Sequence, residues 1–282
     1  MAIANFVPTL WSAVILRDLQ KRFVYAGVCN RNYEGEISQV GDRVRISTAN
    51  AVSVRTYTKG TAITYDDIDG TYQDFIVDQA KYWALKIEDI DRLQMKPDLM
   101  AESVTLAGVA ISDVVDQYVA GILAGSAGVT TDLGTSTTPL EIESTDVVGF
   151  LSLVARRLDE AKVSRAGRWI VIPPWFCQKL TLSKIEADTN NSEVLSSGYV
   201  GHYVGFDIFM SPNVPNTASA KWKILAGTSE GMTYADQIIE TEAIRLESNF
   251  ADALRGLYVY AGKVIQPNAL ALAYCNEAAE AA

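Results

Sequence analysis

The stretch from Pro97 to Ala124 constrains the fold of this chain most strongly, because its apolar side chains repeat at the spacing of an α-helix. They fall three or four residues apart, at Met100, Val104, Ala107, Ile111, Val114, Tyr118 and Ile122. Pro97 and Asp98 suit the start of a helix, and Gly125 suits its end. A helix over this stretch would run for roughly 40 Å at about 1.5 Å per residue. The pattern predicts a long amphipathic core helix on which other elements pack.

Residues 33–87 change to a period of two, which predicts β-strands. Arg43–Ile46 and Val52–Arg55 alternate polar and apolar side chains, and a third run leads from Phe75 towards Leu85. Between these runs, residues 56–70 are polar, with few large apolar side chains. A two-stranded hairpin is only marginally stable by itself in water. We therefore expect this loop either to fold back on its own domain or to be held by a partner subunit.

The second half of the chain predicts an α/β arrangement. Helical patterns over residues 145–162 and 175–185 enclose Arg168–Ile172, a short apolar run that is typical of a buried strand and stops at Pro173. A segment rich in Gly, Ser and Thr, residues 126–138, marks a domain boundary. Strands are also expected within 198–215, 221–226, 238–246 and 254–265, a short helix within 8–25, and a frayed tail over 276–282.

Composition limits the class of protein. The 282 residues suffice for one large domain or two modest ones, and the net charge of −10 disfavours broad contact with phosphates. Cys29, Cys177 and Cys275 are too few and too far apart for a disulfide framework or a C-x-x-C metal pair, so we expect free thiols. The N-terminus lacks the basic region of a signal peptide, and no apolar run reaches about 18 residues. These features predict a soluble protein made inside a cell, with no membrane span.

No group of residues forms a convincing catalytic or metal-binding motif. His202 is the only histidine, and the chain has no G-x-S-x-G motif for a nucleophile. The run Asp66-Asp67-Ile68-Asp69-Gly70 lacks the full spacing and the closing Glu of a calcium loop, so a solvated loop is expected. Glu88-Asp89-Ile90-Asp91 could supply paired carboxylates, but such residues more often open a helix where a strand gives way to one.

Two further clusters also fail as binding sites. Gly198, Gly201 and Gly205 follow a polar loop, and no helix start comes after them to hold a phosphate, so we expect them to let strands bend. Lys21-Arg22 with Arg31 is too small a basic cluster for nucleic-acid binding. We expect no catalytic site, no metal and no cofactor.

Short blocks of sequence follow one another in a characteristic order over most of the chain. They are Phe6-Val7-Pro8 with Trp11, Asn30–Glu36, Gly41–Val44, Asp78–Tyr82, Arg157–Glu160, Arg168–Pro174, Gly205–Ile208 with Ser211 and Pro215, and Gly262–Val264. In order and approximate spacing the set resembles the major capsid proteins of tailed bacteriophages, which have the Hong Kong ninety-seven-like fold. One departure is Ser164, where the related pattern has Pro, and it affects the exit from the helix predicted over 145–162.

The resemblance implies an α+β fold with the parts of a phage capsid subunit. These parts are an N-terminal arm over residues 1–34, an extended β-hairpin loop over 35–80, a peripheral domain over 81–143 with its spine helix at 98–124, an axial domain over 144–240, return strands of the peripheral domain over 241–275, and a tail over 276–282. On this assignment, Glu102, Asp113 and Asp116 of the spine helix would face the shell interior or a neighbouring subunit.

The resemblance also implies a function. The chain would be a major capsid protein that self-assembles into pentamers and hexamers and builds the icosahedral shell around the double-stranded DNA of a phage. The extended loop would contact a neighbouring subunit through Arg55, Tyr57, Lys59, Tyr65, Asp66 and Asp67. Some relatives cross-link a loop lysine to a neighbour; Lys59 lies in the corresponding loop, but no matching motif accompanies it.

The implied partners are copies of the chain itself, a separate scaffolding protein, a portal and decoration proteins. Assembly would take place in the cytoplasm of a bacterial host, and the final location would be the virion. An N-terminal scaffolding domain often precedes the arm in relatives, whereas here the arm starts close to Met1. We therefore expect either a separate scaffolding protein or an arm that has already been trimmed.

Two alternative functions remain open at this stage. An encapsulin-like shell protein of a cellular compartment would share the fold but enclose a cargo enzyme. A cytosolic α/β enzyme would use the carboxylates between Glu88 and Asp91.

Overall fold

The computed structural model describes residues 23–33, 41–48, 54–60, 62–63, 65, 71–88, 98–183, 199–217, 221–246 and 251–279. Its helices are α2 (Tyr25–Val28), α4 (Asp98–Ser126), α5 (Val147–Glu160) and α6 (Pro174–Leu182), with short 3-10 turns η2 (Ser229–Gly231) and η3 (Pro267–Ala269). Its strands are β1 (Arg43–Thr48), β2 (Thr71–Ile76), β3 (Gln79–Glu88), β4 (Leu140–Ile142), β5 (Arg168–Ile172), β6 (Tyr199–Tyr203), β7 (Phe206–Met210), β8 (Asn216–Thr217), β9 (Lys221–Thr228), β10 (Met232–Arg245), β11 (Ala251–Val264) and β12 (Leu270–Glu277).

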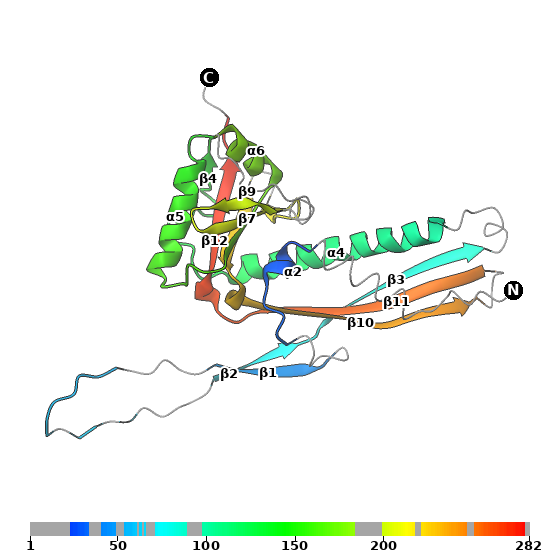
Figure 1. The fold of residues 1–282 in the computed structure, drawn as a ribbon, viewed down its shortest axis with the longest axis horizontal. Helices are drawn as coiled ribbons and strands as arrows, with labels where there is room; N and C mark the ends of the chain where they lie inside the picture. The colour runs from blue at the N-terminus through cyan, green and yellow to red at the C-terminus, as the bar shows by residue number, and fades with distance from the viewer. Residues whose placement is uncertain are drawn as a thin grey trace.

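These elements form three regions (Figure 1). A long sheet of β10, β11 and β3 runs beside α4. A second, seven-stranded sheet has the order β4-β12-β9-β5-β7-β6, with the short β8 paired to β9, and packs with α5 and α6. The third region is the hairpin of β1 and β2, which extends away from both. The expected combination of a helix-backed sheet, an α/β region and an extended hairpin is present.

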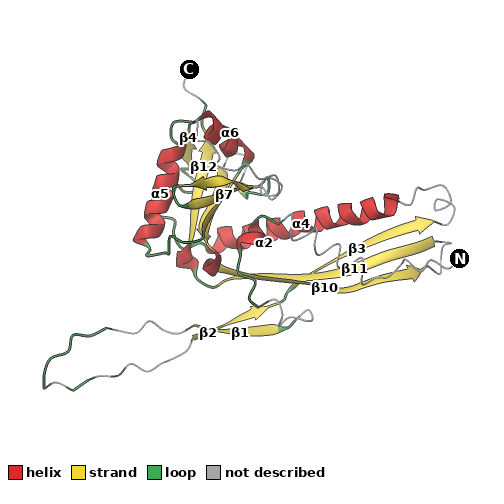
Figure 2. Ribbon diagram, viewed as in Figure 1, coloured by secondary structure: helices red, strands yellow, loops and turns green. Residues whose placement is uncertain are grey.

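The long helix predicted over residues 98–124 is present as α4, a helix of 29 residues. Figure 2 shows α4 running beside the long sheet of β10, β11 and β3. Val115, Val119 and Leu123 of α4 are fully buried in a core that they share with this sheet. The part from Leu106 to Ser126 is long and apolar enough to cross a membrane by length and composition. Its buried side packs on the sheet, which gives α4 the role of a core helix.

One expectation about α4 is wrong. Asp116 does not face outward, because only 3% of it is exposed and its carboxylate accepts hydrogen bonds from the backbone of Val24 and Ala26. Asp113 is exposed, as expected, and accepts hydrogen bonds from Gln117 at 3.0 Å and from Asn213 at 2.7 Å. The side chain of Glu102 lies outside the described residues. Helical periodicity alone did not separate Asp113 from Asp116, because the burial of Asp116 comes from α2, a distant segment.

The long sheet has different partners on its two faces. Tyr258 and Tyr260 of β11 are buried in the same core as α4, while Val259 and Ala261 contact the β1–β2 hairpin on the other face. Alternation of side chains along a strand produces this division. One strand of the sheet therefore connects the helix on one side to the hairpin on the other.

The β1–β2 hairpin combines the two arrangements left open by its sequence. Its strands pair antiparallel from Arg43 opposite Ile76 to Thr48 opposite Thr71. The base packs on its own domain through inward-facing apolar side chains, namely Val44, Ile46, Phe75 and Val77. Beyond the base, the loop leaves the body of the molecule (Figure 1). Residues 54–60 are not in a strand, although Val52–Arg55 predicted one, and residues 51–53 lie outside the described part.

The seven-stranded sheet confirms the buried strand at Arg168–Ile172. This strand, β5, is buried at every position and lies between β7, which is parallel to it, and β9, which is antiparallel. The flanking helices α5 and α6 pack on the sheet with Phe150 and Phe176 in edge contact at 5.5 Å between ring centroids. Helices predicted over 145–162 and 175–185 are therefore present with slightly different ends.

The C-terminal assignment requires a correction. Residues 276–282 were expected to be a tail, but Asn276 and Glu277 belong to β12, which pairs with β9 and β4. Residues 241–275 were expected to lie together, whereas β11 lies in the long sheet and β12 in the seven-stranded sheet. The run Leu270–Cys275 is almost continuously buried, so it has no alternating pattern and is hard to recognise as a strand from sequence.

Candidate subunit interface

The tip of the hairpin, defined here as residues 54–65, presents large apolar side chains to solvent. Val54 is 98% exposed, Tyr57 71%, Ile63 65% and Tyr65 84%. Burying such side chains is favourable by about 25 cal/mol per Å² of apolar area. A cluster of exposed apolar groups on a soluble protein commonly marks a contact surface. The tip is therefore the strongest candidate for an interface in the described part of the chain.

The structure places the predicted interface residues as follows. Arg55, Tyr57, Lys59 and Tyr65 are all exposed on the tip. Asp66 and Asp67 lie outside the described residues. The burial of the first four in an assembled shell is not tested by a single chain and stays a prediction.

Sequence reasoning missed several exposed apolar residues near this loop. Besides Val54 and Ile63, they are Tyr72 at 59% and Ile76 at 42% on β2, and Tyr82 at 81% on β3. Alternation on β2 was the available signal, since Phe75 faces the core and its neighbours face outward. The outward face of a strand is expected to be polar, so apolar residues on that face indicated a surface that a partner would cover.

Polar contacts join the two strands of the hairpin base, and one further contact fixes the base to the body. Arg45 lies over the ring of Tyr72 at 4.2 Å and forms an exposed ion pair with Asp74 at 3.4 Å. Lys263 Nζ of β11 donates a hydrogen bond to the carbonyl oxygen of Asp74 at 2.8 Å. Together with the apolar contacts of the base, these bonds set the direction in which the tip leaves the body.

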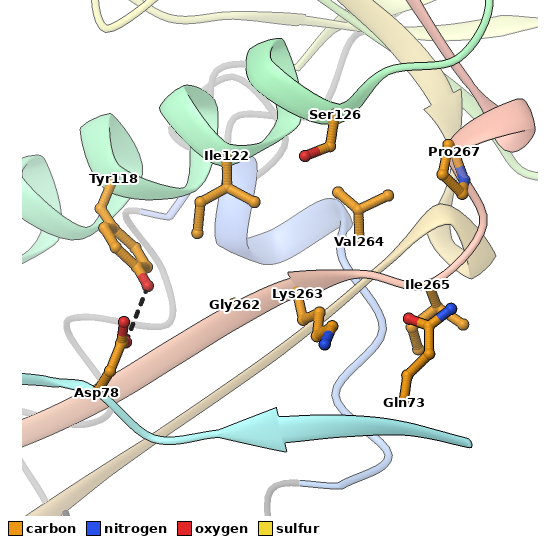
Figure 3. A pocket seen from close by; sticks show the side chains of 10 residues that line it. All are labelled: Gln73, Asp78, Tyr118, Ile122, Ser126, Gly262, Lys263, Val264, Ile265 and Pro267. Carbon is orange, nitrogen blue, oxygen red and sulfur yellow. Dashed lines mark hydrogen bonds between the residues drawn. The ribbon is translucent and has the colours of Figure 1, made fainter. Parts of the chain in front are cut away.

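A cavity of about 620 Å³ lies where the hairpin joins the long sheet and α4 (Figure 3). On its wall, Tyr118 Oη of α4 donates a hydrogen bond to Asp78 Oδ1 at 3.1 Å, just before β3. Burial and the Asp78 carboxylate raise the pKa of Tyr118, which keeps its hydroxyl protonated as the donor. No cluster of metal-binding side chains occurs among the described residues.

The segment 23–33 is anchored by two buried carboxylates from different elements. Asp116 of α4 accepts backbone N–H groups from Val24 at 2.9 Å and Ala26 at 3.2 Å. Asp236 of β10 lies 2.5 Å from Arg31 Nη2 and also accepts the hydroxyl groups of Tyr234 and Tyr258. The segment therefore joins the long helix to the edge strand of the sheet.

These carboxylates have unusual surroundings. Burial raises the pKa of Asp116 to about 6, and the backbone N–H groups that it accepts oppose this rise. Burial, together with Asp236, raises the pKa of the Tyr258 hydroxyl. Asp116 and Asp236 hold the segment 23–33 in place. The raised pKa values of Asp116 and Tyr258 therefore have a structural explanation.

The other sequence candidates do not converge on a site. His202 Nδ1 lies 2.9 Å from Asp207 Oδ1 on the exposed β6–β7 hairpin. Gly205 has a φ of 79° in the turn of that hairpin, so it serves the turn. Arg31 binds Asp236, whereas Lys21, Arg22, Asp69 and Asp89–Asp91 lie outside the described residues. The three cysteines form no disulfide, and Cys29 and Cys275 are buried.

The departure at Ser164 does not disrupt the exit from α5. Arg168 is 3% exposed, and its guanidinium donates to the carbonyl oxygens of Ser164 at 2.8 Å and Val163 at 2.6 Å. It also lies 2.7 Å from Asp159 Oδ1. Hydrogen bonds from Arg165 and Arg168 hold the pKa of Asp159 below its usual value. The hydrogen bonds that Arg168 donates fix the turn after α5, which a proline at position 164 would restrict in the related pattern.

Comparison with known proteins agrees with this architecture. A family model described as phage capsid protein matches residues 48–273. A chain from Mycobacterium phage Che8 is 27% identical, with 96% of this chain and 98% of that chain covered and a TM-score of 0.70. The capsid structure of Cyanophage P-SCSP1u is 16% identical, with coverage of 92% and 90% and a TM-score of 0.70.

A more distant structure shows how widely the fold extends. A virus-like particle from Pyrococcus furiosus is 13% identical, with coverage of 96% and 100% and a TM-score of 0.55. No curated protein sequence matches the chain. The family match spans most of the chain, and the phage capsids share its Hong Kong ninety-seven-like fold. The chain therefore belongs to the phage capsid protein family and is a structural component of a viral shell.

Proposed function

We propose that this chain is the major capsid protein of its phage, which self-assembles into pentamers and hexamers to form an icosahedral shell around double-stranded DNA. The observation that carries the proposal is the hairpin tip, which lies away from the body of its own subunit (Figure 1) and whose apolar side chains are exposed. A second subunit would bury them. The chain then needs no catalytic cleft, and we propose that it is not an enzyme.

Repeated contacts of one kind suit a closed shell. A head-to-tail contact uses two different surfaces of the subunit and closes into a ring when the rotation allows it. Each tip contact is small, but many contacts in one particle give a high collective stability. A net charge of −10 suits a wall that encloses DNA without binding it tightly.

The proposed division of the subunit into parts differs in one point from the division expected from sequence, namely the place of β12. Residues 35–80 form the extended loop, and α4 with the long sheet forms the peripheral domain. The seven-stranded sheet forms the axial domain, which includes β12 because β12 pairs with β9. A scaffolding protein, a portal and decoration proteins would act with the shell in the bacterial cytoplasm, and the finished shell would be part of the virion.

Deletion of residues 55–70 tests the role of the tip. The remaining residues 49–54 would still join β1 to β2, so the hairpin base and its apolar contacts should survive. We expect a subunit with unchanged circular dichroism that forms no closed particles by light scattering and negative-stain microscopy. The double substitution Tyr57→Ser and Tyr65→Ser keeps the loop length and should weaken assembly without abolishing folding.

Two results would count against the proposal. A parent protein that stays monomeric under all assembly conditions would contradict a shell function. Loss of subunit folding on deletion would show that the tip belongs to its own core. An encapsulin-like shell would copurify with a protein cargo in place of nuclease-protected DNA, and an enzyme would lose turnover after substitution of Glu88.

A further inference from the structure

The long sheet and the seven-stranded sheet meet at a junction, defined here as residues 127–129, 227–231 and 265–270. Three parts of the described chain pass through it: the loop after α4, the turn η2 between β9 and β10, and the turn η3 between β11 and β12. Figure 1 shows β11 running into β12 at the corner between the two sheets. The orientation of one sheet relative to the other therefore depends on how these three parts pack together.

Backbone hydrogen bonds join the three parts of the junction. The N–H of Gly128, after α4, donates to the carbonyl oxygen of Pro267 at 2.8 Å. The N–H of Ile265 donates to the carbonyl oxygen of Gly231 at 2.9 Å. The chain between β11 and β12 is therefore bonded on one side to the loop after α4 and on the other side to η2.

Leu270, the first residue of β12, fills a socket that is formed by two glycines. It is fully buried and lies opposite Gly227 of β9 in the strand register. A Cβ added at Gly227 would lie 2.7 Å from Leu270 Cδ2, and a Cβ added at Gly231 would lie 2.6 Å from Leu270 Cγ. Carbon atoms in contact are normally about 3.5–4.0 Å apart. Neither glycine can therefore gain a side chain unless Leu270 moves.

The core around Leu270 is shared by the two sheets. Leu270 and Leu272 of β12 belong to the same buried cluster as Val119 of α4 and Tyr234 of β10. Ala271, which lies between the two leucines, belongs to the cluster on the α5 side of the seven-stranded sheet. A shift of Leu270 would therefore change how the seven-stranded sheet packs against α4 and the long sheet.

One contact links the same two regions outside the junction. Asn213 Nδ2, in the loop after β7, donates a solvent-exposed hydrogen bond to Asp113 Oδ1 of α4 at 2.7 Å. An exposed hydrogen bond contributes little, because water replaces either partner when the bond opens. The buried socket of Leu270 therefore has more influence on the orientation of the two sheets than this bond.

We propose that Leu270, seated between Gly227 and Gly231, sets the angle between the two sheets and thereby determines the diameter of the shell. The inference rests on the proposed function and assigns to it a size-determining residue. Repeated contacts close only when the rotation from one subunit to the next allows it. If both sheets carry contact surfaces, the angle between them fixes this rotation, and a small change repeated in every subunit changes the curvature of the wall.

A purely structural role of Leu270 predicts a different result. Replacing a buried leucine by alanine destabilises a protein wherever the leucine lies, because it leaves a cavity. Leu151 of α5 is also fully buried, but it lies in the cluster between α5 and the seven-stranded sheet, away from the junction. Leu151→Ala is therefore the matched control, since it removes the same atoms without opening the socket.

A double-mutant cycle tests the proposal through the particle diameters seen in negative-stain microscopy and dynamic light scattering. Leu270→Ala empties the socket and Gly231→Ala overfills it, so each change should give at least about half of the particles a diameter different from that of the parent. The double variant should return most particles to the parent diameter, because the new methyl group at 231 occupies space that the Leu270 side chain leaves. Leu151→Ala should lower the urea midpoint of the subunit and keep the parent diameter.

The outcomes separate this inference from the proposed function. If the parent forms no particles, the proposed function fails. If the parent assembles and both single variants at the junction form particles of the parent diameter, this inference is wrong. Altered diameters that the double variant does not correct, or equal changes in Leu151→Ala, would also overturn it. Should the Leu270→Ala subunit not fold, Leu270→Val opens a smaller space in the same socket, and a parent diameter for that variant counts against the inference in the same way.

Discussion

Asp116 Oδ2 accepts a hydrogen bond from the backbone N–H of Val24 at 2.9 Å, although 92 positions separate the two residues. The bond joins the middle of α4 to the segment that begins at Phe23, and it places a carboxylate in the core. A buried carboxylate that receives backbone donors is partly compensated for its lost hydration. The pKa of Asp116, raised to about 6, shows that the compensation is incomplete.

Subunit stability should therefore depend on pH through Asp116. Its pKa in the folded state is higher than the unfolded value of 3.8, so the folded state binds the proton more tightly. Stability from this group is greatest below the unfolded pKa and is lost as pH rises through the folded pKa. Between pH of about 5 and about 7.5, the loss should be about 1.5 kcal/mol.

The variant Asp116→Asn isolates this contribution, because it cannot titrate. Urea unfolding of unassembled subunits should be measured at the two pH values. The free energy of unfolding of the variant should increase relative to that of the parent as pH rises. A constant difference between the two proteins would mean that Asp116 has an ordinary pKa in the folded subunit.

Sequence periodicity predicted α4, α5 and the β1–β2 hairpin, because each buries a regular pattern on one face. Strand β5 was predicted from a short apolar run that stops at Pro173. Periodicity failed for Asp116 and for β12. The carboxylate of Asp116 is buried by α2, which lies far away in the chain, and no local pattern records such a contact. Strand β12 is buried along most of its length, which removes the alternation by which strands are recognised.

The candidate interface was predictable only in part. The polar hairpin indicated either packing on its own domain or a partner subunit, and the family resemblance identified Tyr57 and Tyr65 on it as interface residues. The exposure of Val54 and Ile63 depends on the path of the loop away from the body, which is set by contacts at the hairpin base. Lys263 and Val259 make such contacts from the opposite end of the chain.

The Asp236 cluster should be worth far more to stability than an exposed ion pair. Asp236 is 5% exposed and holds Arg31 together with two tyrosine hydroxyl groups. Asp236→Ala should lower the free energy of unfolding by about 3 kcal/mol, because it leaves buried donors without their acceptor. Asp252→Ala, which removes the exposed pair with Arg245, should cost less than about 1 kcal/mol. Equal shifts of the urea midpoint would contradict the anchoring role of Asp236.

Two glycines should respond in opposite directions to the same substitution. Gly134 has a φ of 77°, and an added Cβ would lie 2.5 Å from the carbonyl oxygen of Tyr274. Gly134→Ala should destabilise the subunit by about 2 kcal/mol or more. Gly121 lies inside α4 with nothing within 4 Å of an added Cβ, so Gly121→Ala should stabilise it by about 0.5–1 kcal/mol. Thermal unfolding measures both; a stabilised Gly134→Ala subunit would contradict the close approach of Tyr274.

The turn between α5 and β5 offers a comparison of two arginines that share one carboxylate. Asp159 lies 2.7 Å from Arg168 Nη2 and 2.5 Å from Arg165 Nη2. The side chain of Arg168 is 2% exposed and that of Arg165 is 80% exposed. Arg168→Met should cost about 3 kcal/mol, because it also removes the hydrogen bonds that Arg168 donates to three backbone carbonyl groups. Arg165→Met should cost much less than Arg168→Met, because the ion pair of Arg165 is exposed to solvent.

Both changes should raise the pKa of Asp159, since each removes a hydrogen bond that favours its charged form. NMR titration of the Asp159 carboxyl therefore shows whether each arginine was bound, and urea unfolding shows what the bond contributes. If the two variants lose the same stability, Arg168 acts only through Asp159. A larger loss for Arg168→Met would show that its bonds to the carbonyl groups of Val163 and Ser164 hold the turn in place without a proline.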